Sequence, residues 1–150
     1  MCGICGELKF KEYSFNEEKL TTLMGSISNR GRDSNGIFRN DDIFLGHHRL
    51  SIIDTSNKSN QPMKVGNYII IFNGIIYNYI DLRNKLIAKG HVFNSSGDTE
   101  VIIKMFIEYG DNCVNHLDGV FSFCIYDTTK KNIFLARDRS GEKPLYFYQK

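Results

Sequence analysis

Apolar residues follow two kinds of spacing along this chain. Continuous or alternating apolar runs predict strands, whereas apolar residues three or four positions apart predict helices. The predicted strands are 2–10, 36–39, 43–53, 68–72, 120–126, 132–136 and 145–148. Helices are predicted at 15–28, at 79–89 and in a segment that begins at 98 and includes 102–109. Because the strands cluster at the two ends of the chain, the pattern favours an α+β fold over a regular βαβ alternation.

Short polar motifs predict where these elements begin and end. Ser14 followed by Glu17 forms a capping box ahead of the first helix. Gly90 is placed to end the second helix as the residue after its C-cap, and Asp98 stands where an N-cap belongs before the third. Asn73-Gly74, directly after the 68–72 strand, is a strong hairpin-turn sequence.

The composition indicates one globular domain. The chain has 150 residues, of which 41% are hydrophobic and 13% aromatic, too many for a disordered chain. The net charge is +2 without blocks of like charge, so nothing predicts a nucleic-acid or anionic-membrane partner. The longest apolar run, 68–72, is far shorter than the ~20 residues of a membrane-spanning helix.

Four cysteines are too few for a secreted disulfide scaffold, and no signal peptide is evident, so we expect a cytoplasmic protein. Cys2 and Cys5 form a C-x-x-C pair, which raises zinc binding or redox chemistry as alternatives. No second pair stands at matching spacing, so we expect no metal. Cys113 and Cys124 are expected to be buried and inert.

Two further polar groups have structural interpretations. His47 and His48 are adjacent on a predicted strand, so their side chains point to opposite faces and cannot share a metal. The run Arg137-Asp138-Arg139 is expected to form a surface or interface turn. Neither group predicts catalysis by itself.

Position 2 offers a different chemistry. Removal of Met1 would leave Cys2 with a free α-amine, whose reference pKa of about 7.7–8.0 lies near working pH. A thiol and a partly neutral amine on one residue supply a nucleophile and a base together. A cysteine at position 2 is weak support without other motifs.

Five polar segments are not explained by helix or strand periodicity: 2–4, 30–36, 46–52, 72–78 and 96–100. Taken in order, they resemble the glutaminase domain of class II glutamine amidotransferases, which are N-terminal-nucleophile (Ntn) enzymes. The chain is most similar to the branch of glutamine-hydrolysing asparagine synthetase. Further matches lie at 50–54, 61–63, 117–123, 135–139 and 141–146.

The resemblance implies a division of roles among five residues. Cys2 would be the nucleophile that forms a thioester with the side chain of L-glutamine. The Asn73 side-chain amide and the Gly74 backbone N–H would stabilise the oxyanion. Arg49 would bind the α-carboxylate of glutamine, and Asp98 would bind its α-ammonium.

Two more positions complete the expected site. Ile75 stands where asparagine synthetases usually have Glu, so it keeps a backbone N–H near the substrate but removes a carboxylate. Arg30 matches a family position beside the active site and is expected to be supporting rather than catalytic. In having an apolar residue at this position, the chain resembles the glucosamine-phosphate synthase branch of the family.

By resemblance, the fold is a four-layer α-β-β-α sandwich with two stacked antiparallel sheets. Residues 1–150 would be one glutamine amidotransferase domain, truncated at its C-terminal end and linked in the full protein to a synthetase domain. ATP and magnesium are expected only in that domain, no cofactor is expected here, and a homodimer is left open. Two alternatives remain: an amidotransferase with another acceptor, such as a sugar, and a glutamine-binding regulatory module without turnover.

Overall fold

Two antiparallel sheets stack against each other in the computed structural model, which describes residues 1–10 and 14–149. The three-stranded sheet has the order β1-β3-β2, with β1 at Gly3–Leu8, β2 at Ser34–Arg39 and β3 at Ile43–Arg49. The four-stranded sheet has the order β4-β5-β6-β7, with β4 at Met63–Val65, β5 at Tyr68–Ile76, β6 at Gly119–Asp127 and β7 at Asn132–Arg137.

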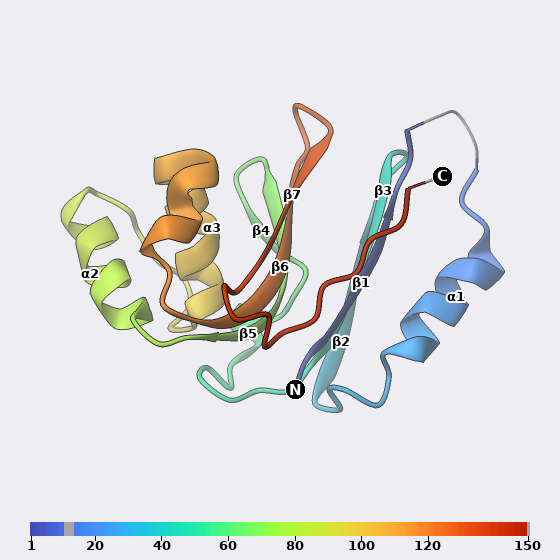
Figure 1. Ribbon diagram of the computed structural model, residues 1–150, viewed down its shortest axis with the longest axis horizontal. Helices are drawn as coiled ribbons and strands as arrows, with labels where there is room; N and C mark the ends of the chain where they lie inside the picture. Colours follow the sequence, from blue (N-terminus) through green and yellow to red (C-terminus); the bar gives the residue numbers. More distant parts are fainter. Residues whose placement is uncertain (11–13, 150) are drawn as a thin grey trace.

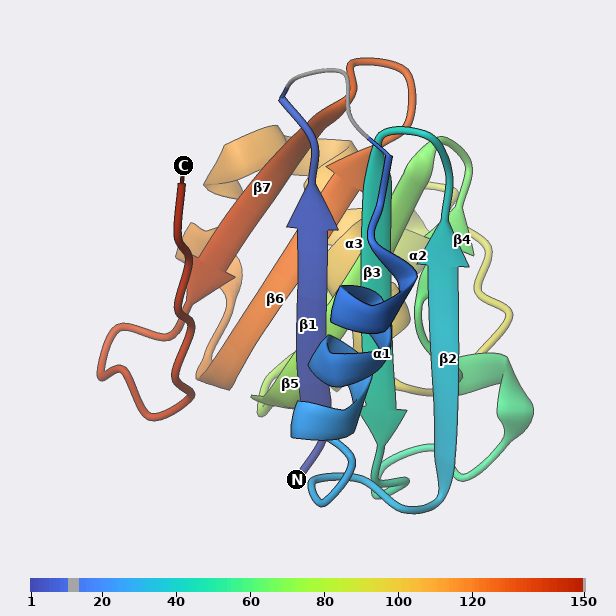
Figure 2. The ribbon, with the colours of Figure 1, turned by 90° about the vertical axis from the view of Figure 1, so that its right-hand side faces the viewer.

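Helices cover both outer faces of this pair of sheets. The helix α1 (Glu17–Ser26) lies on the outer face of the three-stranded sheet, whereas α2 (Tyr79–Ala88) and α3 (Asp98–Tyr109) lie on the outer face of the four-stranded sheet (Figures 1 and 2). Short 3-10 helices occupy Asn57–Ser59 and Gly110–His116. The layers therefore run α-β-β-α, which confirms the predicted fold class.

Within the described ranges, no helix has both the length and the apolar character to cross a membrane.

The alternation of side chains along β5 builds two cores. Ile69 and Ile71 face the three-stranded sheet and pack with β3 and β6, whereas Ile70 and Phe72 face α2 and α3. Cys124 belongs to the layer between the sheets, and Cys113 to the core under the helices. Both cysteines are buried, as predicted.

The hairpin turn that Asn73-Gly74 favours as an isolated sequence does not form, because β5 continues through both residues to Ile76. In this stretch Asn73 pairs with Ser122 and Gly74 with Phe121 on β6. Gly74 has a φ of +155°, and a Cβ there would lie against the carbonyl oxygen of Val120. The glycine therefore allows a close approach of two strands rather than a turn.

The predicted element ends also needed correction. The first strand spans only Gly3–Leu8, and the 43–53 strand ends at Arg49. The N-cap of α1 is Asn16 rather than Ser14, because the Asn16 Oδ1 accepts a hydrogen bond from the Lys19 N–H at 3.0 Å. Gly97 takes the N-cap position of α3, so Asp98 is the first helical residue. Gly90 follows the C-cap of α2 with a φ of +93°, as predicted.

Of two predictions near the C-terminus, one is wrong and the other is confirmed only in part. Residues 145–148 form no strand, and the side chains of Tyr146, Phe147 and Tyr148 are 79–90% exposed. A turn does begin at Asp138, because the Gly141 N–H donates to its carbonyl oxygen at 3.1 Å, and Arg137 and Arg139 are exposed. Asp138 itself, however, is not a surface residue, since it is only 4% exposed. Its carboxylate accepts hydrogen bonds from the N–H groups of Phe121 and Lys143, among others, and so ties the loop after β7 to β6.

Candidate active site

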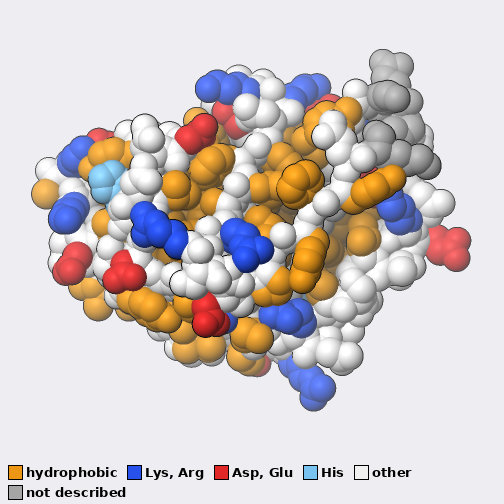
Figure 3. Space-filling view, viewed as in Figure 1, with side chains coloured by type: hydrophobic (Ala, Val, Ile, Leu, Met, Phe, Trp, Pro, Cys, Tyr) orange, Lys and Arg blue, Asp and Glu red, His pale blue; other side chains and the backbone are white. Residues whose placement is uncertain are grey.

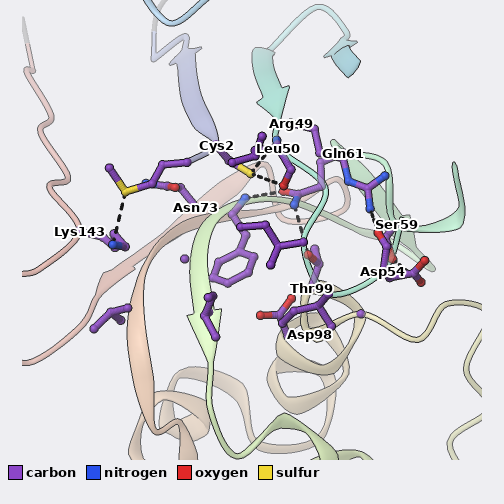
Figure 4. A pocket seen from close by; sticks show the side chains of 18 residues that line it. Cys2, Arg49, Leu50, Asp54, Ser59, Gln61, Asn73, Asp98, Thr99 and Lys143 are labelled. Atoms are coloured by element: carbon purple, nitrogen blue, oxygen red, sulfur yellow. Dashed lines mark hydrogen bonds between the residues drawn. The ribbon is translucent and has the colours of Figure 1, made fainter. Parts of the chain in front are cut away.

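A pocket of about 110 Å³ opens where β1 and α3 begin and where β3 and β5 end (Figure 4). Six of the seven residues selected from the sequence line it: Cys2, Arg49, Asn73, Gly74, Ile75 and Asp98. The seventh, Arg30, does not. Four different elements and their flanking loops thus bring a thiol, an amide, a guanidinium and a carboxylate to one cavity.

The thiol of Cys2 lies against the chain that follows β3. The antiparallel pairing of Gly3 with His48 brings Cys2 next to Leu50. The Leu50 N–H donates a hydrogen bond to the Cys2 Sγ at 3.4 Å, and the Leu50 carbonyl oxygen lies 3.6 Å from that sulfur. Burial raises the pKa of the thiol, although the Leu50 N–H, the chain's N-terminus and Arg49 act in the opposite direction. The thiol is therefore protonated at neutral pH, and a base is needed to activate it.

Arg30 supports the backbone of this segment instead of entering the pocket. Its Nε donates a hydrogen bond to the Cys2 carbonyl oxygen at 2.9 Å. The following Gly31 packs directly against the backbone of His48 and Arg49, where a Cβ would not fit. The Asp33 carboxylate accepts a hydrogen bond from the Ser51 N–H at 2.6 Å. The 30–33 segment thus holds Cys2 and the end of β3 together from outside.

The Arg49 guanidinium is buried, with 6% of the residue exposed. It donates to the carbonyl oxygens of Asp54 and Ser56, the latter at 2.9 Å, and to the Asn60 Oδ1 at 2.8 Å. These bonds use three of the five N–H donors of an arginine side chain. The loop from 54 to 60 is thereby fixed around the guanidinium, and two donors remain for another partner.

The Asp54 carboxylate is the acceptor of a second group of hydrogen bonds beside the pocket. It accepts hydrogen bonds from the Ser56 N–H, the Ser59 hydroxyl and the Ser96 N–H, each at 2.8 Å. Burial raises the pKa of this carboxyl, but the hydrogen bonds outweigh it and hold the pKa well below the ordinary value. Asp54 therefore stays ionised and joins the 54–60 loop to the segment before α3.

One edge of β5 is open beside the pocket. Pairing with β4 ends at Ile70, whereas pairing with β6 continues to Ile76. Backbone groups of alternate residues point to alternate edges of a strand. On the open edge, the Phe72 N–H donates to the Gln61 Oε1 at 2.6 Å and the Ile76 N–H donates to the Asp98 Oδ2 at 3.1 Å. By the same alternation, the Gly74 N–H points out between them.

Asp98 and Ile75 complete the wall on this side. Burial is the largest cause of a raised pKa of about 6 for the Asp98 carboxyl, and nearby backbone N–H groups only partly oppose it. Ile75, half-buried on β5, places an apolar side chain in the lining. On this side, the pocket wall therefore combines the buried Asp98 carboxyl with the apolar side chain of Ile75.

Several other residues line the pocket although the sequence predicted no role for them: Leu50, Asp54, Gln61, Thr99 and Lys143. Gln61 connects two elements, because its Nε2 donates to the Thr99 Oγ1 at 3.2 Å while its Oε1 receives the Phe72 N–H. Its place in the 61–63 match was the only feature that distinguished it. Leu50 acts through its backbone, which a side-chain motif does not report.

Cys2 and Cys5 do not share a site. The Cys5 Sγ lies on the other face of β1, 3.8 Å from the Met24 Sδ of α1, and its pKa is raised to about 11 by burial. All four cysteines are free thiols. Over residues 1–10 and 14–149, no three His, Cys, Asp or Glu side chains gather where they could hold a metal ion. This geometry weighs against zinc binding or a disulfide at the C-x-x-C pair.

A larger groove of about 830 Å³ lies between the edge strands of the two sheets. Hydrophobic side chains gather on this face of the molecule (Figure 3), and the groove is lined by β1, β7 and the exposed 145–149 segment. Its lining includes Cys5 and Cys124 but none of the seven selected residues. The chemistry-bearing groups therefore converge on the smaller pocket.

Residues 1–150 match the family model of the glutamine amidotransferase domain. The chain belongs to the glutamine amidotransferase family. It is 39% identical over 155 residues to asparagine synthetase (glutamine-hydrolyzing) 3 of Bacillus subtilis (strain 168), covering 100% of this chain and 25% of that protein. It is 38% identical to putative asparagine synthetase (glutamine-hydrolyzing) 2 of Methanocaldococcus jannaschii, covering 99% and 32%.

Solved amidotransferase structures share the fold of this domain. Glutamine phosphoribosylpyrophosphate amidotransferase from B. subtilis, complexed with ADP and GMP, superposes with a TM-score of 0.54 at 23% identity, over 66% of this chain and 24% of that one. The structure of the allosteric regulatory enzyme of purine biosynthesis gives a TM-score of 0.57, also at 23% identity, over 68% and 24%. The amidotransferase chain described here spans between a quarter and a third of the curated relatives named above.

Proposed function

We propose that this amidotransferase domain hydrolyses L-glutamine to glutamate and ammonia through a γ-glutamyl thioester on Cys2. One observation carries the proposal: the Cys2 thiol shares a pocket with Asn73 and with the open edge of β5, which presents the Gly74 N–H. A thiol next to two hydrogen-bond donors suits attack on an amide carbonyl, because the donors stabilise the oxyanion that forms. The family membership supports glutamine as the substrate.

The proposed mechanism begins with removal of Met1, which lines the same pocket. The freed α-amine of Cys2 takes the thiol proton, and the thiolate attacks the side-chain carbonyl carbon of glutamine. The amide C–N bond then breaks, and the amine returns the proton to the departing ammonia. Water next attacks the thioester and releases glutamate, which regenerates the Cys2 thiol. The raised pKa of that thiol supports the need for an adjacent base.

We propose that Arg49 and Asp98 recognise the two ends of the amino acid. Arg49 retains two N–H donors after binding the 54–60 loop, enough for a bidentate carboxylate contact. The Asp98 carboxylate lies in the lining at the start of α3 and, when ionised, would pair with the α-ammonium. Ile75 adds no second carboxylate there, so we assign it a backbone and packing role. Arg30 would keep the Cys2 backbone in place.

We further propose that the ammonia supplies asparagine synthesis in a linked synthetase domain, where ATP and magnesium would act. The support is that the curated relatives are named as glutamine-hydrolysing asparagine synthetases and are three to four times longer than the matched segment. Four free cysteines are consistent with a cytoplasmic location. The competing proposal is that the ammonia goes to another acceptor, such as a sugar. Measuring whether the purified full-length protein aminates aspartate or a sugar separates the two.

A glutaminase assay combined with intact-mass measurement tests the proposal. We expect glutamate release, a mass that lacks Met1, and labelling of Cys2 by a glutamine analogue that carries an electrophilic carbon. Glutamine binding without glutamate release or labelling would instead identify a regulatory module. Retention of Met1 in every active molecule would remove the proposed base.

A further inference from the structure

A buried histidine reaches across the layer between the sheets to the backbone of β5. His47 is 0% exposed and lies on β3, two residues before Arg49. Its Nε2 lies 3.1 Å from the Phe72 carbonyl oxygen. Phe72 faces the open edge of β5, where pairing with β4 has already ended. The three-stranded sheet thus supplies a hydrogen-bond partner that the neighbouring strand does not.

The chemistry of this contact defines the state of the imidazole. A carbonyl oxygen only accepts, so the Nε2 of His47 carries the hydrogen and donates it. Burial is the largest cause that lowers the pKa of His47 to about 4, and Arg49 and His48 act in the same direction. The ring is therefore neutral near pH 7, and its Nδ1 has no hydrogen-bond partner among the described residues. The His47 side chain therefore contributes a single hydrogen bond, from its Nε2–H to the Phe72 carbonyl oxygen.

A second side chain holds the other backbone group of the same residue. The Phe72 N–H donates to the Gln61 Oε1 at 2.6 Å, and Gln61 in turn reaches Thr99 on α3. Both backbone groups of Phe72 are thus bound by side chains instead of by a strand. Gln61 fixes β5 relative to α3, whereas His47 fixes it relative to the sheet next to Cys2.

The position of the bound carbonyl makes this contact relevant to the pocket. The Phe72 carbonyl and the Asn73 N–H belong to one planar peptide unit, so a tilt of that plane moves the Asn73 side chain and the Gly74 N–H that follows. Cys2 lies next to Leu50, three residues after His47. One histidine therefore connects the sheet that carries the thiol to the strand that carries the proposed oxyanion donors.

We propose that His47 is a positioning residue, which sets the distance of Asn73 and Gly74 from Cys2 by donating its Nε2–H to the Phe72 carbonyl. It does not touch the substrate, and its catalytic consequence rests on the glutaminase function proposed above. Loss of the donor loosens residues 72–74 and weakens the contacts that matter most in the transition state, so kcat falls more than KM rises.

Two variants and one control test this in the purified protein. His47→Leu keeps an apolar side chain but removes the donor, whereas His47→Gln places an amide N–H near the position of Nε2. Leu45→Ala is the matched control, because Leu45 is buried on the same face of β3 but belongs to the apolar layer between the sheets. Each variant is measured by hydrogen exchange on peptides that cover 72–76 and by steady-state glutamine hydrolysis.

For His47→Leu we expect faster exchange at 72–76 and a kcat lower by about 10- to 100-fold, below the full effect of losing an oxyanion donor, with KM within about threefold. His47→Gln restores both measurements to within about threefold of the original. Leu45→Ala lowers thermal stability but keeps kcat per folded molecule. Unchanged exchange in His47→Leu, equal losses in the Gln and Leu variants, or a normal kcat despite faster exchange would each overturn the proposal. If the unsubstituted protein has no turnover, the glutaminase proposal fails, whereas the exchange data still decide whether His47 orders residues 72–74.

Discussion

The Asp98 carboxylate accepts a hydrogen bond from the Ile76 N–H at 3.1 Å, so the first turn of α3 is tied to the end of β5. This bond fixes the carboxyl on the open edge of the strand, beside the outward-pointing Gly74 N–H. The same burial that orders the group raises its pKa to about 6. A group proposed to bind an ammonium is therefore poised to lose its charge just below neutral pH.

Glutamine binding should weaken in acid because Asp98 becomes neutral. Above pH 6 the Asp98 carboxylate is ionised and pairs with the α-ammonium of glutamine. Below pH 6 the carboxyl is protonated and must lose its proton before it can form this pair. In Cys2→Ala, which binds without turnover, we expect the glutamine Kd to rise about tenfold for each pH unit below 6. Titration calorimetry between pH 5 and pH 8 measures this directly.

Asp98→Asn serves as the control for that titration. It keeps the size of the side chain and removes the ionisation, so its weaker Kd should not change with pH across the same range. A Kd for the Cys2→Ala protein that is flat from pH 5 to pH 8 would contradict the role of Asp98 in binding the ammonium.

Substitution of Cys2, just before β1, and of Cys5, on β1, should have opposite effects on activity. Cys2→Ala is expected to abolish glutamate release, because no thioester can form. Cys5→Ala should retain turnover, since the Cys5 thiol faces Met24 and α1 on the other side of the strand. Assaying the two variants side by side, with circular dichroism to confirm folding, separates nucleophile loss from damage to the strand. Equal activity in both would reject Cys2 as the nucleophile.

Asn73→Ala should affect the chemical step more than substrate binding. The amide is proposed to contact the oxyanion, whose charge develops only in the transition state. We expect kcat to fall about 10²- to 10³-fold, the usual effect of removing one oxyanion donor, with a small change in KM. Ser122→Ala is a suitable comparison, because Ser122 pairs with Asn73 on β6 but its buried hydroxyl has no partner in the described chain. A large rise in KM with normal kcat would assign Asn73 to binding instead.

Much of this architecture could be predicted because the strong local patterns agree with the packing. The apolar run at 68–72 and the helix that begins at Asp98 both lie in the core, and all of the selected motif residues except Arg30 line one pocket. Motifs carry this information because they combine residue type with order along the chain. They do not depend on the exact ends of the elements, which were the least accurate part.

The misses have a common physical cause: tertiary contacts override local preference. Asn73-Gly74 favours a turn in isolation, but β6 offers a continuous ladder and the glycine lets that strand approach. His47 and Gln61 gave no local sign of a role, because their partner, Phe72, is 25 residues away from one and 11 from the other. Hydrogen bonds of that separation are not encoded in a periodic pattern.

Asp138 shows the same effect and yields a prediction about stability. Its buried carboxylate accepts N–H bonds from Phe121 at 3.1 Å and from Glu142 and Lys143 at 2.9 Å each. Burial raises the pKa of the carboxyl, but these bonds outweigh it and hold the pKa below the ordinary value of 3.8. Because the folded-state pKa is lowered, the stabilisation is fully present above the ordinary pKa and is lost as the pH falls through the lower pKa of the folded state.

Asp138→Asn should therefore lower the free energy of unfolding by about 1–3 kcal/mol at pH 7, since it replaces a charged acceptor of three N–H groups. The gap between this variant and the original should narrow as the pH falls from about 4 through the lowered pKa of the folded carboxyl, because the original then becomes protonated as well. Asp118→Asn, an exposed residue just before β6, is the control and should change stability by less than about 0.5 kcal/mol. Urea unfolding of the three proteins at pH 7 and at pH 2.5 gives the free energies of unfolding to be compared. A gap that is the same at both pH values would show that shape, rather than the carboxylate charge, accounts for the contribution of Asp138.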